Sequence, residues 1–84
     1  MVKVTFTRHA TEKFDLISRF GFEVSQDYVI ATITAPDRTE RRGVQTFSTK
    51  VFDKEFALRV VHEERKGIIV VITFYPVRRK RYGL

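Results

Sequence analysis

The hydrophobic positions of the chain repeat with two different periods. Apolar residues alternate with polar ones over 2–6, which predicts a short amphipathic strand. Over 10–20 they recur at three- and four-residue steps, as expected of one buried stripe on a helix. Thr7 is a suitable N-cap for this helix, and Gly21 suits the left-handed residue that closes it. The pattern therefore predicts a strand followed directly by a helix.

A second helix is predicted soon after the first. Ser25 has the short polar side chain of an N-cap, and Asp27 lies in the first turn, where its charge favours the helix dipole. The apolar residues of 29–33 supply the buried face. Pro36 ends the helix because it lacks a backbone N–H and restricts the residue before it. The two short helices and their short link predict a helical hairpin.

The second half of the chain has the pattern of a β-sheet. Three runs, 44–52, 56–63 and 68–75, are rich in β-branched and aromatic residues and predict consecutive strands. The polar segment 37–43 predicts a loop, and 64–67 predicts a hairpin turn. The order β-α-α-β-β-β predicts an α+β fold. In it, the helical hairpin covers one face of an antiparallel sheet and the first strand joins an edge.

The register of the first predicted β-hairpin decides where Lys50 lies. In the strand 56–63 the even-numbered residues form the better core face, so Arg59 points to the open face, away from the helices. A two-residue turn at 53–54 pairs Lys50 with Ala57 and places it beside Arg59. A three-residue turn would send Lys50 towards the core, where an unpaired charge costs several kcal/mol. The two-residue register is therefore predicted, and it places two apolar side chains in the core, Phe47 and Val51.

Composition and charge narrow the functional classes. The 84 residues suffice for a single domain, 1–84. Sixteen Lys and Arg against ten Asp and Glu give a net charge of +6, and much of the excess lies in a basic C-terminal tail at 77–84. Such a cluster attracts polyanions or an acidic protein surface, or is simply a solvated tail. The absence of cysteine excludes disulfides, thiolate zinc sites and a cysteine nucleophile.

Nothing in the sequence predicts a membrane segment or a secretion signal. The longest apolar run, 68–72, is far shorter than the roughly 20 residues that span a bilayer. The first residues lack the apolar stretch of a signal peptide. We therefore expect a cytoplasmic protein with no membrane partner.

The predicted open face gathers cations that suit a phosphodiester. Lys50 and Arg59, together with the basic tail, can bind backbone phosphates. They can also stabilise the charge that develops on phosphorus when the 2′-OH of RNA attacks, which requires no metal. Tyr75 and Tyr82 can stack on bases or, if polarised by nearby cations, move a proton. Each residue has a structural alternative, since Arg59 can pair with an acidic neighbour and Tyr75 can pack on the next strand.

His9 and His62 are the only histidines. Either can serve as an acid or base near neutral pH. They lack the spacing of a zinc motif, so hydrogen-bonded structural roles and no metal or other cofactor are expected.

Several segments of the chain resemble the DUF4258 family. They are His9-Ala10-x-Glu12-Lys13-Phe14, Arg19-x-Gly21-Phe22, Ser25-x-Asp27-x-Val29, Pro36-Asp37, Leu58-Arg59-Val60-Val61-His62 and Ile69–Pro76. That family is similar to the RelE/ParE toxin superfamily, which has the same element order. The resemblance covers most of the chain and implies a single RelE/ParE-like domain.

The resemblance to RelE-type toxins implies an endoribonuclease that cuts messenger RNA in the ribosomal A site without metal. It also implies an acidic antitoxin partner. The catalytic residues of that superfamily would correspond to Lys50, Arg59, Arg78 and Tyr82, with Phe52 where a second lysine is expected. The residues predicted to contact RNA are Arg79, Lys80, Arg81, Lys54 and Tyr75. Two alternatives stay open: a non-catalytic module that binds nucleic acid or protein, and a ParE-like toxin that acts on gyrase.

Overall fold

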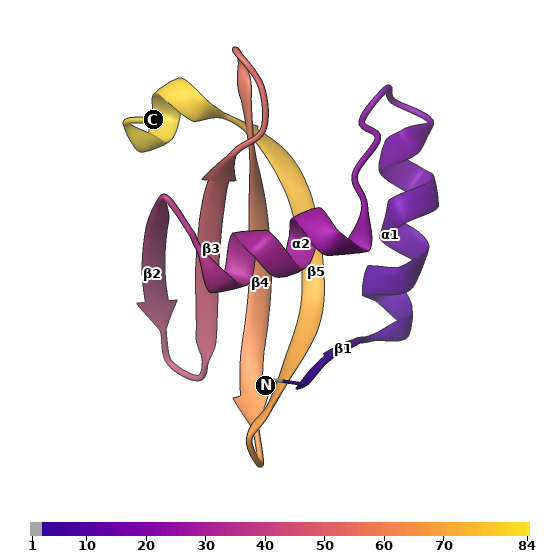
Figure 1. Ribbon diagram of the computed structural model, residues 1–84, viewed down its shortest axis with the longest axis vertical. Coiled ribbons are helices and arrows are strands. Elements are labelled where there is room, and N and C mark those ends of the chain that lie inside the picture. The colour runs from indigo at the N-terminus through magenta and orange to yellow at the C-terminus, as the bar shows by residue number, and fades with distance from the viewer. Residues whose placement is uncertain (1–2) are drawn as a thin grey trace.

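The computed structural model describes residues 3–84 and shows an α+β fold with one strand more than predicted. Its elements are β1 (Lys3–Phe6), α1 (Arg8–Ser18), α2 (Gln26–Thr34), β2 (Arg38–Arg42), β3 (Gln45–Val51), β4 (Phe56–Arg65), β5 (Ile68–Arg78) and a 3₁₀ helix, η1 (Arg79–Tyr82). The five strands form one sheet in the order β1-β5-β4-β3-β2 (Figure 1). Neighbouring strands are antiparallel except β1, which runs parallel to β5. The predicted position of the first strand at an edge of the sheet is confirmed. Val2, the first apolar position of the predicted strand, lies outside the described residues.

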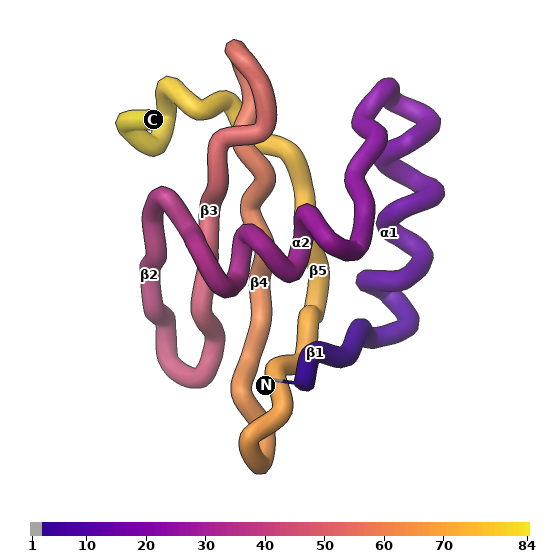
Figure 2. The backbone as a smooth tube through the Cα atoms, in the orientation of Figure 1, coloured from indigo at the N-terminus to yellow at the C-terminus, as the bar shows by residue number. Residues whose placement is uncertain are grey.

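The predicted caps begin both helices. The Thr7 hydroxyl accepts a hydrogen bond from the Ala10 amide at 3.1 Å and donates one to the Ile72 carbonyl at 3.0 Å, so it also ties α1 to β5. Ser25 Oγ accepts from the Tyr28 amide at 3.1 Å. Figure 2 shows α1 running along one side of the sheet while α2 crosses its middle strands. Both helices therefore pack on the same face of the sheet.

The core lies between the helices and this helix-covered face. Its buried members come from both helices and from the two central strands: Ala10, Ile17, Val29, Leu58, Val60, Val71 and Phe74. The predicted core parity of β4 is confirmed, because Leu58 and Val60 face the helices and Arg59 faces the opposite way. A register shift in β5 opposite Val61 and His62 keeps both Val71 and Phe74 in the core despite their odd spacing.

The segment predicted as a loop is instead the edge strand β2. Arg38 pairs with Thr49 and Arg42 with Gln45, so the polar run continues the sheet beyond β3. Most of its side chains are exposed, which removes the apolar alternation that identifies a half-buried strand. Charged residues are common on such edges because they oppose pairing with another chain.

The predicted register of the β3–β4 hairpin is wrong by one residue. Val51 pairs with Ala57, and Lys50 pairs with Leu58 on the helix-covered face. Lys50 remains partly exposed there, and its Nζ donates to the Ala35 carbonyl at 3.0 Å, at the C-terminus of α2, where a cation is favoured. Val51, and with it Phe47, therefore lies on the open face and not in the core.

The start of the predicted tail belongs to the sheet. β5 continues to Arg78, and η1 follows directly, so Val77 and Arg78 are strand residues. Gly83 closes η1 in the left-handed conformation, with φ of 70°. Between residues 3 and 84, no helix is long and apolar enough to cross a membrane.

Candidate nucleic-acid interface

Arginines and aromatic rings alternate across the open face of the sheet. The guanidinium carbon of Arg42 lies 5.0 Å from the ring centroid of Phe47, and that of Arg59 lies 4.8 Å from the same centroid. Arg59 also lies 4.7 Å from the ring centroid of Tyr82, which in turn lies 5.8 Å from Arg38. These distances are within the range of cation–π attraction. We call the series Arg42–Phe47–Arg59–Tyr82–Arg38 the arginine–aromatic ladder.

Strand pairing builds this ladder, because residues paired across a sheet share a face. One row across β2, β3, β4 and β5 consists of Arg38, Thr49, Arg59 and Tyr75. The next row includes Glu40 and Phe47. The ladder therefore combines three consecutive strands, β2, β3 and β4, with Tyr82 from η1.

Arg59 is the buried centre of the ladder. It is only 3% exposed, and its Nη1 donates to Thr49 Oγ1 at 3.1 Å. Its Nη2 donates to Glu40 Oε2 at 3.4 Å. A buried charge is tolerated when it is paired and hydrogen-bonded, and Arg59 meets both conditions. The prediction that Arg59 lies on the open face is confirmed, but its guanidinium is already bound by protein groups.

Glu40 connects the three arginines of the ladder. Its carboxylate lies 3.2 Å from Arg38, 3.4 Å from Arg42 and 3.4 Å from Arg59. Burial alone would raise the pKa of Glu40, but the attraction of Arg59, with that of Arg38 and Arg42, lowers it below its usual value. Glu40 is therefore ionised near neutral pH, and the three arginines of the ladder together with Glu40 have a net charge of +2.

The C-terminal segment, residues 79–84, is held against the open face. Arg38 Nη1 donates to the Tyr82 carbonyl at 2.9 Å. At the other end of η1, the Arg79 amide donates to the Glu55 carbonyl at 3.0 Å and its Nη1 to the Asp53 carbonyl at 3.1 Å. Figure 1 shows this segment, in yellow, near the ends of β2 and β3. What composition suggested as a tail is thus a folded cationic surface, on which Lys80 and Arg81 are exposed.

The structure assembles only half of the predicted catalytic set. Arg59 and Tyr82 are in contact on the open face. Lys50 instead lies on the helix-covered face, so its predicted place beside Arg59 is wrong. Arg78 pairs with Phe56 on that same face and forms an ion pair with Glu55 at 2.8 Å. The physical reason is the one-residue register difference for Lys50 and the strand parity for Arg78.

The residues predicted to contact RNA fall in two places. Lys54, Arg79 and Lys80 line a common pocket with Arg78, beside the β3–β4 hairpin. Tyr75 is half-buried and is the strand partner of Arg59, on the same open face of the sheet. Arg81 is exposed on η1.

Sequence reasoning missed the part of the interface that β2 contributes. Arg38, Glu40 and Arg42 are spaced by two residues, which places all three on one face of a strand. That spacing, with alternating charge, is the signal that the run could be a strand with a charged face. Phe47 was assigned to the core, and its stacking between two guanidinium groups followed only from the observed register.

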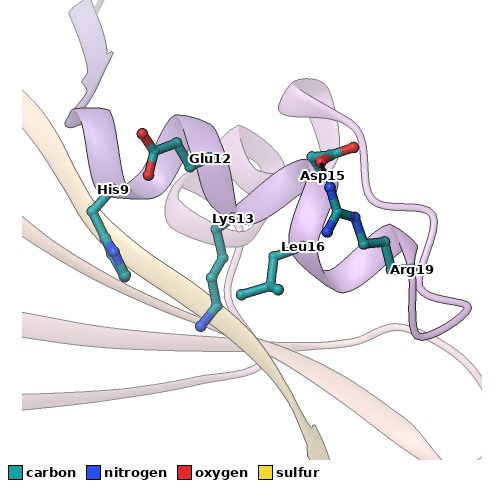
Figure 3. A pocket seen from close by; sticks show the side chains of 6 residues that line it. All are labelled: His9, Glu12, Lys13, Asp15, Leu16 and Arg19. Atoms are coloured by element: carbon teal, nitrogen blue, oxygen red, sulfur yellow. Dashed lines mark hydrogen bonds and ion pairs between the residues drawn. The ribbon is translucent and has the colours of Figure 1, made fainter.

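Both histidines have structural partners. His62 is nearly buried, its Nε2 lies 2.9 Å from Ser48 Oγ, and burial lowers its pKa. His9 Nε2 lies 3.2 Å from Thr73 Oγ1 in β5. Figure 3 shows His9 among charged side chains of α1 that line a shallow pocket of about 260 Å³. In the described part of the chain, no group of three or more His, Asp or Glu side chains is placed to hold a metal ion.

Compared with models of known protein families, with curated proteins and with solved structures, the chain matches none. The resemblance to the DUF4258 family and to RelE/ParE toxins therefore stays a prediction that depends on the sequence segments alone.

Proposed function

We propose that this protein binds nucleic acid, with single-stranded RNA as its ligand. The binding surface is the basic surface, which we define as the arginine–aromatic ladder together with Lys54 and the C-terminal segment. The observation that carries the proposal is the attachment of the C-terminal segment to the ladder through Tyr82. This attachment fixes a cluster of cations beside a row of stacked arginines and rings.

The chemistry of the basic surface suits a single strand. The side chains of Arg38 and Arg42 are 47% and 68% exposed at the two ends of the ladder. Guanidinium planes can stack on unpaired bases and also grip phosphate oxygens with two donors. The C-terminal segment adds point charges that follow a phosphate backbone. The choice of RNA over DNA depends on the resemblance to RelE-type toxins.

Fixing the segment also favours binding energetically. A flexible tail loses conformational entropy when it binds, at about 0.5–1.5 kcal/mol for each immobilised long side chain plus the backbone. Here the backbone of η1 is already ordered by its bonds to Arg38 and Glu55. We therefore expect the segment to act as a preorganised surface.

Titration of a labelled single-stranded RNA, followed by fluorescence anisotropy over a range of salt concentrations, tests the proposal. Removing two exposed cations of the segment, in Lys80→Ala/Arg81→Ala, should reduce the slope of log K against log salt by about 1.4, since each phosphate contact contributes about 0.7. The matched control, Arg8→Ala/Arg19→Ala, removes two cations from α1 and its C-cap, where each is paired with an acidic residue. Lack of binding by the wild type, or an equal change in slope for both variants, would contradict the proposal.

A second candidate, RNA cleavage, is supported by the contact between Arg59 and Tyr82. For cleavage, Glu40 would have to release Arg59 so that its guanidinium could reach a phosphate. Tyr82→Phe keeps the ring that packs on Arg59 and removes the hydroxyl, so it should lower product yield without changing thermal stability. An acidic antitoxin would compete with RNA for the same basic surface. Absence of new 5′ ends in messenger RNA treated with wild-type protein, with and without ribosomes, would reject this candidate.

A further inference from the structure

A concave pocket lies at one end of the basic surface. It has a volume of about 510 Å³, which is within the range of small-ligand sites. The residues that line it come from the β3–β4 hairpin, the end of β5 and the C-terminal segment: Lys54, Glu55, Arg78, Arg79, Lys80 and Leu84. No residue of the ladder lines it, so this pocket is a separate feature.

Backbone and side-chain bonds give the pocket a defined shape. Glu55 accepts from the Arg79 amide through its carbonyl and from Arg78 through its carboxylate, at 3.0 and 2.8 Å. The Asp53 side chain accepts from the amides of Glu55 and Phe56 at 2.9 and 2.7 Å, which fixes the hairpin beside Lys54. These bonds join the two halves of the pocket wall.

The C-terminal segment closes the remaining side. The left-handed turn at Gly83 reverses the chain, and the amides of Gly83 and Leu84 donate to the Lys80 and Arg79 carbonyls at 3.2 and 3.1 Å. This return places Leu84 in the wall beside the cations. The pocket therefore offers an apolar contact next to its charged groups.

The charge of the lining exceeds what an internal phosphodiester would need. Four cationic side chains against the one side-chain carboxylate of Glu55 give the side chains of the lining a net charge of +3. A phosphodiester carries one negative charge, whereas a phosphate monoester carries about −1.5 to −2 at neutral pH and has three strong acceptor oxygens. Several Lys and Arg side chains that line one concave site match the monoester better.

We propose that this pocket binds a phosphate monoester attached to a nucleoside, and so recognises a phosphorylated terminus of the bound strand. This inference depends on the proposed nucleic-acid binding and specifies one subsite of it. The phosphate would lie among Lys54, Arg79 and Lys80, and the terminal sugar or base would contact Leu84. A free nucleoside monophosphate has the same chemistry and is the second source to test.

Competition between short RNAs of one sequence, ending in a 5′-phosphate, a 3′-phosphate or hydroxyls at both ends, tests the inference on the full-length protein. One phosphorylated form should bind about tenfold more tightly than the hydroxyl form, equivalent to about 1.4 kcal/mol. This preference should decrease below pH 6, where the monoester dianion binds one proton and becomes a monoanion. If adenosine monophosphate displaces that form at a similar concentration, a free nucleotide is the ligand. If it does not, the strand terminus is the ligand.

Lys54→Ala/Lys80→Ala should abolish the preference for the phosphorylated end, and because both side chains are exposed the fold should be retained, as circular dichroism can confirm. Arg42→Ala, outside the pocket, should weaken all three RNAs by the same factor. Equal binding of the three RNAs by the wild type would overturn the pocket assignment and leave the proposed function intact. No binding of any RNA would overturn both. Displacement of RNA by a glutamate peptide as readily as by the monophosphate would assign the pocket to an acidic protein instead.

Discussion

Replacing Arg59 by alanine should destabilise the fold by about 3–4 kcal/mol. The side chain packs between the rings of Phe47 and Tyr82, and each desolvated cation–π contact contributes about 1 kcal/mol or more. The charged hydrogen bond to Thr49 adds about 1.5 kcal/mol. This sum excludes the ion pair with Glu40, which keeps contact with solvent. For a domain of 84 residues, such a loss lowers Tm by more than about 12 °C.

Urea unfolding followed by circular dichroism measures this difference. The control is Arg78→Ala, which removes an arginine from an exposed ion pair with Glu55 and from a cation–π contact with Phe56 at 4.8 Å, and which should cost only about 0.7–2 kcal/mol. An Arg59→Ala variant as stable as Arg78→Ala would show that the ladder is not a structural centre. The expected loss of stability would lower any activity, whether or not Arg59 contacts RNA directly. For this reason Arg59→Ala alone cannot test catalysis, whereas Tyr82→Phe can.

Further predictions concern the caps, the pH dependence and the two faces of the sheet. Thr7→Ala should lower the free energy of unfolding by more than the roughly 1 kcal/mol expected for Ser25→Ala, because the Thr7 hydroxyl also donates to β5; urea midpoints measure both. Burial lowers the pKa of His62, so below pH 6.5 the unfolded state binds more protons than the folded state. The free energy of unfolding should therefore be highest above pH 6.5 and should fall as the pH decreases below that value. His62→Gln should flatten this pH dependence, as thermal melts at several pH values can measure. An unchanged dependence of Tm on pH would show that His62 is not its cause. Glu40→Gln should tighten RNA binding in anisotropy titrations because it removes the anion from the ladder, whereas Lys50→Ala should leave the affinity unchanged.

Local sequence signals were sufficient to predict where the two helices begin and which residues of the central strand, β4, face the helices. Thr7 and Ser25 cap the helices because a short polar side chain at those positions satisfies free amides, a requirement that does not depend on the rest of the fold. Likewise, the alternation in β4 separates Leu58 from Arg59 whatever lies on either side.

The errors arose where tertiary contacts outweighed local preference. The desolvation argument assigned Lys50 to the open face, but the carbonyl of Ala35 lies within reach on the other face and accepts a hydrogen bond from Lys50 Nζ. That carbonyl is brought near by the packing of α2, which no local pattern reveals. β2 was missed because its side chains show no apolar alternation. An edge strand can form through backbone hydrogen bonds to one neighbour alone, which here is β3.

The sequence predicted the kind of residues in the candidate site, but only some of their positions in the fold. Arg59 was expected on the open face and is observed there, in contact with the ring of Tyr82. The acidic partner of Arg59 is Glu40, from the strand that was not predicted. The cations of Arg79 and Lys80 were assigned to a tail, and only their contacts with the hairpin show a pocket.

Mapping amide chemical shifts by NMR during titration with single-stranded RNA tests most directly where nucleic acid binds. Our account predicts that the largest changes fall in β2, in the β3–β4 hairpin and in residues 78–84, with little change in α1. Changes concentrated on α1 and the helix-covered face, with residues 78–84 unaffected, would contradict it.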